Sequence, residues 1–288
     1  MQSHPPHPVP AKDDYHQALQ RIETVHGNMA VIARLGSMLR EPDIGIDQVA
    51  RLIHTDGALC VNIIRLSNSA FYGASSRSTT LPDALARVGY NRILSVIGAA
   101  LSKRLFMHDL KAYGMSADDY WAYSYFCGVL LEEQAYQAEA PPESAYLVGL
   151  LHALGRVVLN ELLITRKMEV YWDPSLPAEE WETIVVGFRH DQAGAHLLRA
   201  WKFEHEIYQR VADQKKPERI AADPLLRLLD FARRTAELNR FRVATPDWSL
   251  PSDGAWENEP DRDIAALASA VDRARVACLQ IARILKGE

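Results

Sequence analysis

The residues best suited to chemistry in this sequence are two histidines that stand among regularly spaced apolar residues. His152 follows the apolar run AYLVGLL, and Arg156 lies one helical turn later, so the two side chains can face the same side of a helix. Together they could line a pocket that holds an anion. We favour a structural role for His152, because a lone histidine on an apolar helix is more often a hydrogen-bonded core residue than a ligand. His190 precedes Asp191, and this pair suits the first turn of a helix.

Several common enzyme motifs are missing from the sequence. It has neither GxxxxGKS/T nor GxGxxG, the loops that bind nucleotide phosphates, and it has no GxSxG turn for a nucleophilic serine. Asp43, Asp47 and Asp56 do not have the spacing of a calcium loop. These classes of site therefore have no support.

Composition and charge indicate an ordinary globular protein. Hydrophobic residues make up 48% and charged residues 24% of the 288 residues, and 37 acidic against 32 basic side chains give a net charge of -5. This charge supplies no general attraction to nucleic acid or to an anionic membrane. The three cysteines, Cys60, Cys127 and Cys278, form no CxxC pair, so the sequence predicts neither a disulfide framework nor a zinc ribbon and fits a reducing cytoplasm.

We expect no membrane segment in this sequence. The opening MQSHPPHPVPAKDD lacks the apolar stretch of a signal peptide, and we interpret residues 1–13 as a disordered lead. SVIGAAL and AYLVGLL are both soon interrupted by polar residues, so neither reaches the roughly 18 apolar residues that a membrane-spanning helix needs. The expected location is the cytoplasm.

The elements that must position these residues are helices. Apolar residues recur at helical spacing through most of the chain, without alternating β-branched runs, so we predict an all-α fold. The helices predicted in the first half are 14–40 with a break near Gly27, 46–54, one from Thr55 or Asp56 to Gly73, a short one capped by Thr80 and ended by Gly89, one ending at Phe106, and 118–137 capped by Ser116.

The second half of the chain begins with its most apolar segment. After Pro141 and Pro142, ESAYLVGLLHALGRVVLNELL is apolar on nearly every side, which predicts one helix buried in the middle of a domain. Further helices are predicted around 178–188, 191–201, 204–213, 224–239 and 261–285. Residues 241–261 form the long loop, and their two tryptophans indicate that it packs on the rest of the protein.

The polar end of the helix that begins near Thr55 is unusual. Asn68 and Ser69 precede AFYG, and we favour the interpretation that their side chains bond nearby backbone groups and end the helix. The alternative is that this polar group, with Tyr72, faces a second lobe and couples the two.

Two further groups of residues could form surfaces. Five aromatic residues encircle one predicted helix, so some must meet another element or a partner, and we expect a homodimer through them. They are Tyr120, Trp121, Tyr123, Tyr125 and Phe126. Scattered basic residues could form a strip that binds nucleic acid, but the acidity of the chain argues against it. They are Arg77, Arg87, Arg92, Lys103 and Arg104. QKKPER is interpreted as a surface corner.

Four segments have an order and spacing that together identify a family. They are EPDIGIDQVARLIHTDGALCVNIIRLSNSAFYG, LPDALARVGYNRILSVIGAALSKRLF, AYLVGLLHALGRVVL and HDQAGAHLLRAWKF. The first two resemble the N-terminal lobe of HDOD domains, and the others resemble that family's segments AFxAGLLHDIGKLVL and HxxVGAxLLxxWxL. The resemblance spans roughly residues 20 to 235. It implies a two-lobed, multi-helix fold related to the HD phosphohydrolases.

The division that we predict has four parts. The disordered lead covers 1–13, the N-terminal lobe 14–110 and the HD-like lobe 111–240, while a loop and C-terminal helix over 241–288 pack on the HD-like lobe.

The resemblance also implies that a metal site has been lost. HD phosphohydrolases place a histidine directly before an aspartate to hold metals that activate water. Here His152 is followed by Ala153, which has no oxygen ligand to offer. Tyr123 stands where those enzymes offer a helical histidine, and Asp213 with Gln214 stands where a paired histidine would fall. The vestigial site that remains consists of His152, Arg156, His190, Asp230 and Tyr123.

We therefore expect a non-catalytic bacterial regulatory module without metal or cofactor. The expected partner is a signalling protein, such as a sensor kinase, a receiver or a cyclic-di-GMP-turnover protein, and a small ligand could be sensed as well. The alternative is a divergent metal-dependent phosphohydrolase that acts on a nucleotide or cyclic dinucleotide through His152, His190 and Asp230.

Overall fold

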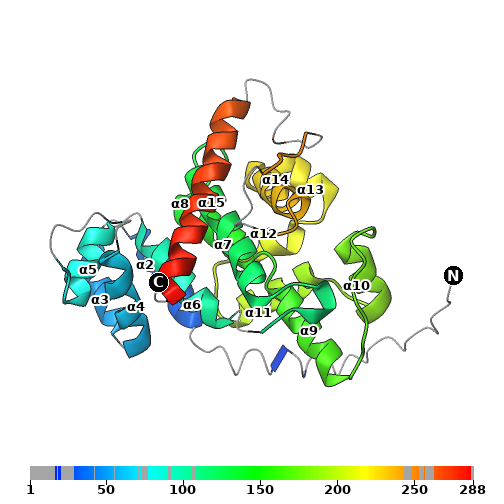
Figure 1. Ribbon diagram of the computed structural model, residues 1–288, viewed down its shortest axis with the longest axis horizontal. Helices are drawn as coiled ribbons and strands as arrows, with labels where there is room; N and C mark the ends of the chain where they lie inside the picture. Colours follow the sequence, from blue (N-terminus) through cyan, green and yellow to red (C-terminus); the bar gives the residue numbers. More distant parts are fainter. Residues whose placement is uncertain are drawn as a thin grey trace.

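The protein is described here by a computed structural model. The described residues are 17, 19–20, 29–41, 43–54, 56–69, 72, 77–89, 92–105, 108–242, 248–252, 256 and 263–286. Within them the secondary structure is helical, apart from an isolated antiparallel bridge between Leu110 and Met115. The predicted all-α, two-lobed fold is confirmed (Figure 1). The predicted lead 1–13 and the break near Gly27 lie outside the described residues.

The N-terminal lobe contains five described helices. They are α2 (Met29–Met38), α3 (Ile46–Ile53), α4 (Gly57–Ser67), α5 (Leu81–Val88) and α6 (Ile93–Leu105). Local capping starts two of them, and the cap at Thr80 was predicted. The Asp56 carboxylate accepts from the Leu59 N–H at 3.0 Å before α4, and the Thr80 hydroxyl accepts from the Asp83 N–H at 3.3 Å before α5. At the end of α5, Gly89 has a φ of 82°, a value that glycine adopts without strain.

Helix α4 is shorter than predicted. It ends at Ser67, and Gly73, the predicted end, lies outside the described residues. The amide of Asn68 leaves the helix to bond the backbone of Ser78, donating to its carbonyl at 2.8 Å and accepting from its N–H at 2.7 Å. This side chain competes with continued helix formation, which is why the helix stops there.

The second lobe holds the remaining elements. They are η3 (Lys111–Tyr113), α7 (Ala117–Glu133), α8 (Pro142–Leu151), α9 (Gly155–Thr165), α10 (Ala178–Val186), α11 (His190–Ala200), α12 (His205–Asp213), α13 (Pro217–Ala222), α14 (Pro224–Leu238) and α15 (Ile264–Lys286). Ser116 caps α7 as predicted, accepting from the Asp119 N–H at 3.1 Å. Helix α13 corrects the interpretation of QKKPER as a plain corner, because Pro217 at the first helical position begins a short helix there.

Helix α7 is the centre of the molecule. It packs along α8 and also contacts α6, α14 and α15. Figure 1 shows α7 and α8 between the N-terminal lobe and the helices α9 to α14. The five aromatic side chains of α7 that we considered for a dimer are at most 3% exposed, so the chain itself covers them.

The predicted single helix over 143–163 is two helices. α8 ends at Leu151 and α9 begins at Gly155, with turn residues between them. The expectation that no stretch has the length and composition of a membrane span needs correction too, because Pro142–Thr165 has both. Of its most apolar window, 83% is buried inside the protein, where α8 packs on α7 and α9 packs on α11.

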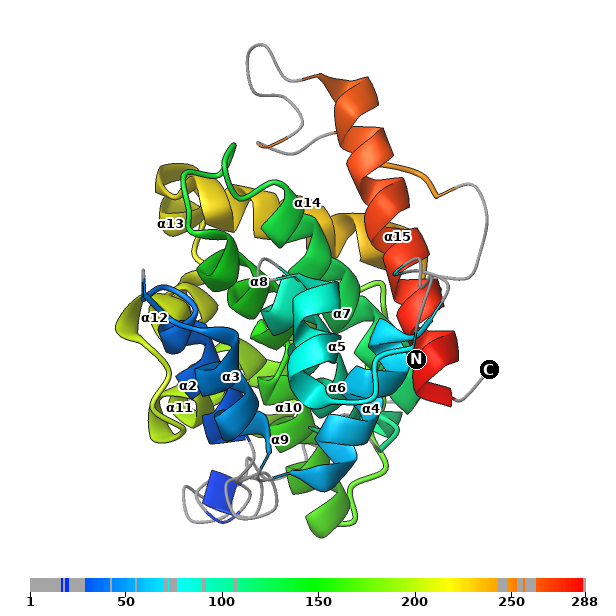
Figure 2. The ribbon, with the colours of Figure 1, turned by 90° about the vertical axis from the view of Figure 1, so that its left-hand side faces the viewer.

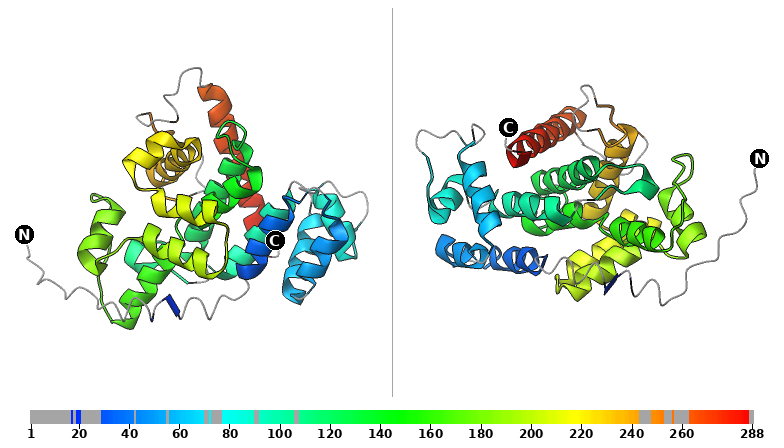
Figure 3. Two further views of the ribbon diagram at one scale, coloured as in Figure 1. Left: turned by 180° about the vertical axis from the view of Figure 1, so that it is seen from behind. Right: turned by 60° about the horizontal axis from the view of Figure 1, so that its bottom comes forward.

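The C-terminal helix contacts both lobes. Helix α15 packs along α7 and also contacts α4, as the views in Figures 2 and 3 show from two sides. The two tryptophans of the segment before it pack on the rest of the protein, as predicted. Trp248 meets Phe126 with 4.9 Å between ring centroids, and Trp256 is 1% exposed.

Candidate functional site

The turn between α8 and α9 places His152 at the centre of the second lobe. Backbone hydrogen bonds in this turn join residues three positions apart, instead of four as in an α-helix. Leu154 N–H donates to Leu151 O at 3.1 Å and Arg156 N–H donates to Ala153 O at 2.9 Å. The amide of Gln214 donates to the carbonyl of His152 at 2.7 Å, and the hydroxyl of Tyr120 donates to that of Ala153 at 2.8 Å. Side chains from α7 and from the end of α12 thus stabilise the turn.

Both ring nitrogens of His152 have protein partners. Nδ1 lies 2.6 Å from the carbonyl oxygen of Gly149, and Nε2 lies 2.8 Å from the hydroxyl of Tyr123. A carbonyl can only accept, so Nδ1 carries the proton and Nε2 accepts from Tyr123. Burial lowers the pKa of His152 well below its usual value, and the charges of Arg233 and Arg156 act in the same direction. His152 is therefore a neutral imidazole whose lone pair is already engaged.

Helix α9 approaches α11 backbone to backbone at Gly155. A Cβ at this position would lie 1.8 Å from the carbonyl oxygen of His190 and 2.7 Å from the backbone nitrogen of Gly194. Only glycine allows this approach. The contact fixes the start of α11, and with it His190, beside the turn that carries His152.

His190 is bound to a buried carboxylate that the sequence did not single out. Its backbone N–H and its Nδ1 each lie 2.8 Å from Glu182 of α10, whose side chain is fully buried. The hydroxyl of Tyr113 donates to the same carboxylate at 2.9 Å. Burial raises the pKa of Glu182, but the charge and hydrogen bonds of His190 outweigh it, so the pKa is lowered overall.

Arg156 lies in a cage of aromatic rings. Its guanidinium carbon is 5.3 Å from the ring centroid of Tyr113, 5.7 Å from that of Tyr123 and 5.9 Å from that of Trp172. The side chain is 1% exposed, and its nearest carboxylate is Glu237 at 3.8 Å. Tyr123 thus contacts both Arg156 and His152.

Helix α14 supplies a second buried cation and its partners. Arg233 is 4% exposed, donates to Asp230 at 2.8 Å and lies 4.0 Å from Glu237. Close by, Lys215 pairs with Glu179 at 3.0 Å. Burial and the charge of Arg233 lower the pKa of Lys215 to about 8, although the carboxylates of Glu237 and Glu179 act in the opposite direction. Asp230 accepts from both Arg233 and Arg234 of the same helix, and among the described residues it bonds neither His152 nor His190.

These residues do not fit a divalent metal ion. The His152 lone pair accepts from Tyr123, Ala153 offers no oxygen, and the cations Arg156 and Arg233 lie close by. A metal needs deprotonated ligands with free lone pairs, and neighbouring guanidinium groups repel it. Among the described residues, no group of three or more histidine, cysteine, aspartate or glutamate side chains is arranged to hold one.

The structure brings most of the predicted site residues into one network. His152 joins Tyr123, Tyr123 joins Arg156, and Asp230 enters only through Arg233. His190 is linked to Arg156 through Glu182 and Tyr113. Glu182, Arg233 and Glu237 were not predicted as site residues, although the spacing of 230, 233, 234 and 237 places four charged residues on one helical face. Glu182 gave no signal, because its burial arises only from tertiary packing.

Asn68, Ser69 and Tyr72 do not act as one group in the structure. Asn68 bonds the backbone of Ser78, and the Ser69 hydroxyl donates to the carbonyl of Leu66 at 2.7 Å, so both act within the N-terminal lobe. Tyr72 lies elsewhere, in the lining of a pocket formed with α7 and α15. Of the basic residues considered as a strip, Arg87 donates to Asn68 at 3.0 Å and Arg92 lines the same pocket.

Comparisons with known proteins agree with this architecture. Residues 28–217 match the HDOD domain family. An HDOD domain protein of unknown function from Geobacter sulfurreducens superposes with a TM-score of 0.66 at 22% identity, covering 87% of this chain and 91% of its own. A proposed signal transduction protein from Marinobacter aquaeolei VT8 gives a TM-score of 0.65 at 21% identity, covering 96% and 65% respectively.

Two further relatives extend the comparison. A proposed phosphohydrolase from Shewanella amazonensis SB2B has a TM-score of 0.61 at 19% identity, covering 95% of this chain and 97% of its own. An uncharacterised protein of Treponema pallidum (strain Nichols) is 24% identical over 197 residues, which are 66% of this chain. The matched region spans 37% of that relative's length. At these identities the solved structures establish the fold.

Proposed function

Because the chain belongs to the HDOD domain family, we propose that it is a non-catalytic regulatory module of signal transduction. In this proposal it acts through contacts with a signalling protein, such as a sensor kinase, a receiver or a cyclic-di-GMP-turnover protein, and it senses a small ligand. We place this activity in the cytoplasm.

The observation that carries the proposal is the hydrogen bond between Tyr123 and Nε2 of His152. This nitrogen is the atom that a histidine ligand would turn toward a metal once Nδ1 is bonded to a backbone carbonyl. A hydroxyl group satisfies it instead. The neighbouring Ala153 and the caged Arg156 support the same conclusion, because neither side chain has a lone pair with which to coordinate a metal.

Metal analysis combined with turnover assays tests this proposal. We expect the purified protein to hold far less than one equivalent of manganese, iron or zinc, and to leave bis-p-nitrophenyl phosphate and cyclic di-GMP intact in the presence of Mn²⁺. The variant Glu180→Gln, on the exposed face of α10, is the matched control. Stoichiometric metal with phosphodiester cleavage that disappears in a folded His152→Gln variant would overturn the proposal and establish the phosphohydrolase alternative.

The partner is tested separately by titration. Purified receiver domains and cyclic-di-GMP-turnover proteins from the same organism are titrated into the protein in a calorimeter. The proposal expects saturable binding of one of them with unchanged affinity after chelation of metals. Binding that requires added metal would contradict it.

A further inference from the structure

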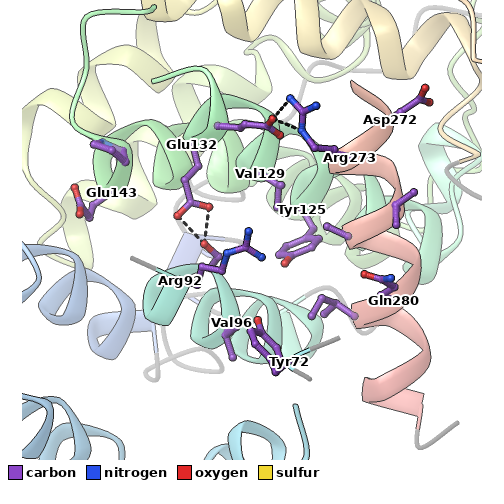
Figure 4. A pocket seen from close by; sticks show the side chains of 16 residues that line it. Tyr72, Arg92, Val96, Tyr125, Val129, Glu132, Glu143, Asp272, Arg273 and Gln280 are labelled. Atoms are coloured by element: carbon purple, nitrogen blue, oxygen red, sulfur yellow. Dashed lines mark hydrogen bonds and ion pairs between the residues drawn. The ribbon is translucent and has the colours of Figure 1, made fainter. Parts of the chain in front are cut away.

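A pocket of about 770 Å³ lies where the N-terminal lobe, α7 and α15 meet. This volume is in the range of sites that bind small organic molecules. Figure 4 shows Tyr125, Val129 and Glu132 entering from α7, Gln280 from α15 and Val96 from α6. The pocket is separate from the network around His152, since its lining includes no residue of that network.

The polar part of the pocket is rich in acceptors and acidic. The hydroxyl of Ser95 is 2.7 Å and 2.5 Å from the two carboxylate oxygens of Glu132, and its one proton leaves most of their lone pairs available. The Oε1 atom of Gln280 is buried and has no hydrogen-bond partner among the described residues. A ligand that donates hydrogen bonds would satisfy both groups.

The charges that line the pocket are mainly negative. Four carboxylates face two guanidinium groups; they are Glu132, Glu133, Glu143 and Asp272 against Arg92 and Arg273. Arg273 is already paired with Glu133, as the dashed lines in Figure 4 show. Asp272 pairs with Arg275 at 3.3 Å. The excess of carboxylates favours a positively charged occupant.

The remaining wall is apolar and aromatic. The side chains of Val96, Val129, Val276 and Ile281 line it together with the ring of Tyr125. Val276 is 46% exposed although it is a large apolar residue, so its surface is available to a ligand. Such a wall suits a hydrocarbon or aromatic body.

We propose that this pocket binds a small organic cation, with its ammonium group against Glu132 and its apolar body against Tyr125 and α15. The inference deepens the proposed function and rests on it, since it names the site and chemical class of the sensed ligand. Because the pocket is lined from α6, α7 and α15, an occupant contacts both lobes at once. Binding would therefore favour one arrangement of the lobes over others.

The binding should depend on pH. The pKa of Glu132 is raised to about 7, because burial and the charge of Glu143 outweigh the hydrogen bond from Ser95 and the charge of Arg92, which lower it. The other charged groups of the lining, Glu133 with Arg273 and Asp272 with Arg275, are paired at the α7–α15 side. A cation binds the ionised form of Glu132, so affinity should rise roughly tenfold between pH 6 and pH 8.

The test uses tryptamine as the probe on the full chain, in buffer with EDTA. Its matched comparators are the neutral 2-(indol-3-yl)ethanol and the anionic indole-3-acetate. Calorimetric titration at pH 8 should show tryptamine binding at least about tenfold tighter than either comparator. Glu132→Gln should weaken tryptamine about tenfold or more, and Glu180→Gln should not change it.

A second variant guards against a folding defect in the first. Val276→Trp adds bulk at an exposed position of the pocket wall and should abolish binding while leaving the melting temperature within a few degrees. Absence of tryptamine binding, equal or tighter binding of indole-3-acetate, or binding unaffected by both variants would each overturn the proposal. EDTA and the absence of any turnover readout keep this result independent of the metal test for the proposed function.

Discussion

The network around His152 and the pocket beside Glu132 both contain buried titratable groups, but they differ in what surrounds those groups. Around His152 the Gly149 carbonyl and the Tyr123 hydroxyl bond both ring nitrogens, and three aromatic rings surround the guanidinium of Arg156. Beside Glu132 a hydroxyl satisfies part of the carboxylate and the rest faces a pocket of about 770 Å³. A buried histidine whose two ring nitrogens both have protein partners indicates a structural role, whereas a carboxylate that faces open space indicates a ligand.

The largest expected effect tests how tightly the His152 network is packed. Gly155→Ala should prevent folding or cost more than about 4 kcal/mol, because its Cβ would lie 1.8 Å from a backbone oxygen that cannot move alone. Gly57→Ala, where nothing lies within 4 Å of the added Cβ, is the control and should be neutral or slightly stabilising. Urea unfolding measures both. A stable Gly155→Ala protein would contradict the close backbone contact between α9 and α11.

The next effect tests the cage around Arg156. Arg156→Ala should lower the free energy of unfolding by about 3 kcal/mol, because it leaves a cavity among three rings and removes the cation beside Glu237. Arg273→Ala at the pocket rim, where the side chain is 59% exposed, should change it by less than about 0.5 kcal/mol. Chemical denaturation measures both variants. Equal losses of unfolding free energy would show that Arg156 is no more important for stability than the exposed Arg273.

Acidification separates the two regions by the sign of its effect. Because the folded-state pKa of His152 is lowered, its neutral form stabilises the protein above its unfolded pKa near 6.5, and this contribution is lost as pH falls below that value. The stability advantage of the natural protein over His152→Gln should shrink by up to about 2 kcal/mol between pH 7 and pH 5. Urea titrations at each pH measure it. An advantage that does not change with pH would contradict a buried neutral imidazole.

Glu132 should show the opposite and smaller dependence. Its folded-state pKa is raised to about 7, so its contribution is fully present below an unfolded pKa near 4.5 and is lost as pH rises through 7. Glu132→Gln should therefore gain stability relative to the natural protein between pH 5 and pH 8, by about 1 kcal/mol once solvent access is allowed for. Thermal unfolding across this range, with Glu180→Gln beside it, measures the gain. A stability difference between Glu132→Gln and the natural protein that does not change with pH would show that burial does not destabilise the ionised carboxylate.

Much of the fold followed from the sequence because its signals are local. The caps at Thr80 and Ser116 are read from neighbouring residues, and the family was recognised from segments of contiguous sequence. The turn at residues 152–154 was not predicted, because the donors that stabilise it, Tyr120 and Gln214, are distant in sequence. Most of the site and the pocket were not predicted for the same reason, because their residues are distant in sequence and come together only in the fold.

Two buried carboxylates could not be identified from the sequence. His152, Arg156 and His190 were found by type and spacing, but Glu182 became visible only when α10 was placed against α11. Glu132 was not singled out from the sequence. Its hydrogen-bond partner Ser95 lies 37 residues earlier, and the pocket that it lines is formed together with α15, far later in the chain.

The contact between Tyr123 and His152 also bears on evolution. If an ancestor of this chain hydrolysed phosphoesters, a single reversion of Ala153 to aspartate would place a carboxylate next to a histidine whose lone pair is taken and beside a caged guanidinium. The reverted protein would gain a buried charge without gaining a metal. Under the function that we propose, restoring a metal site would therefore require changes at several positions at once, because the first of them alone lowers stability.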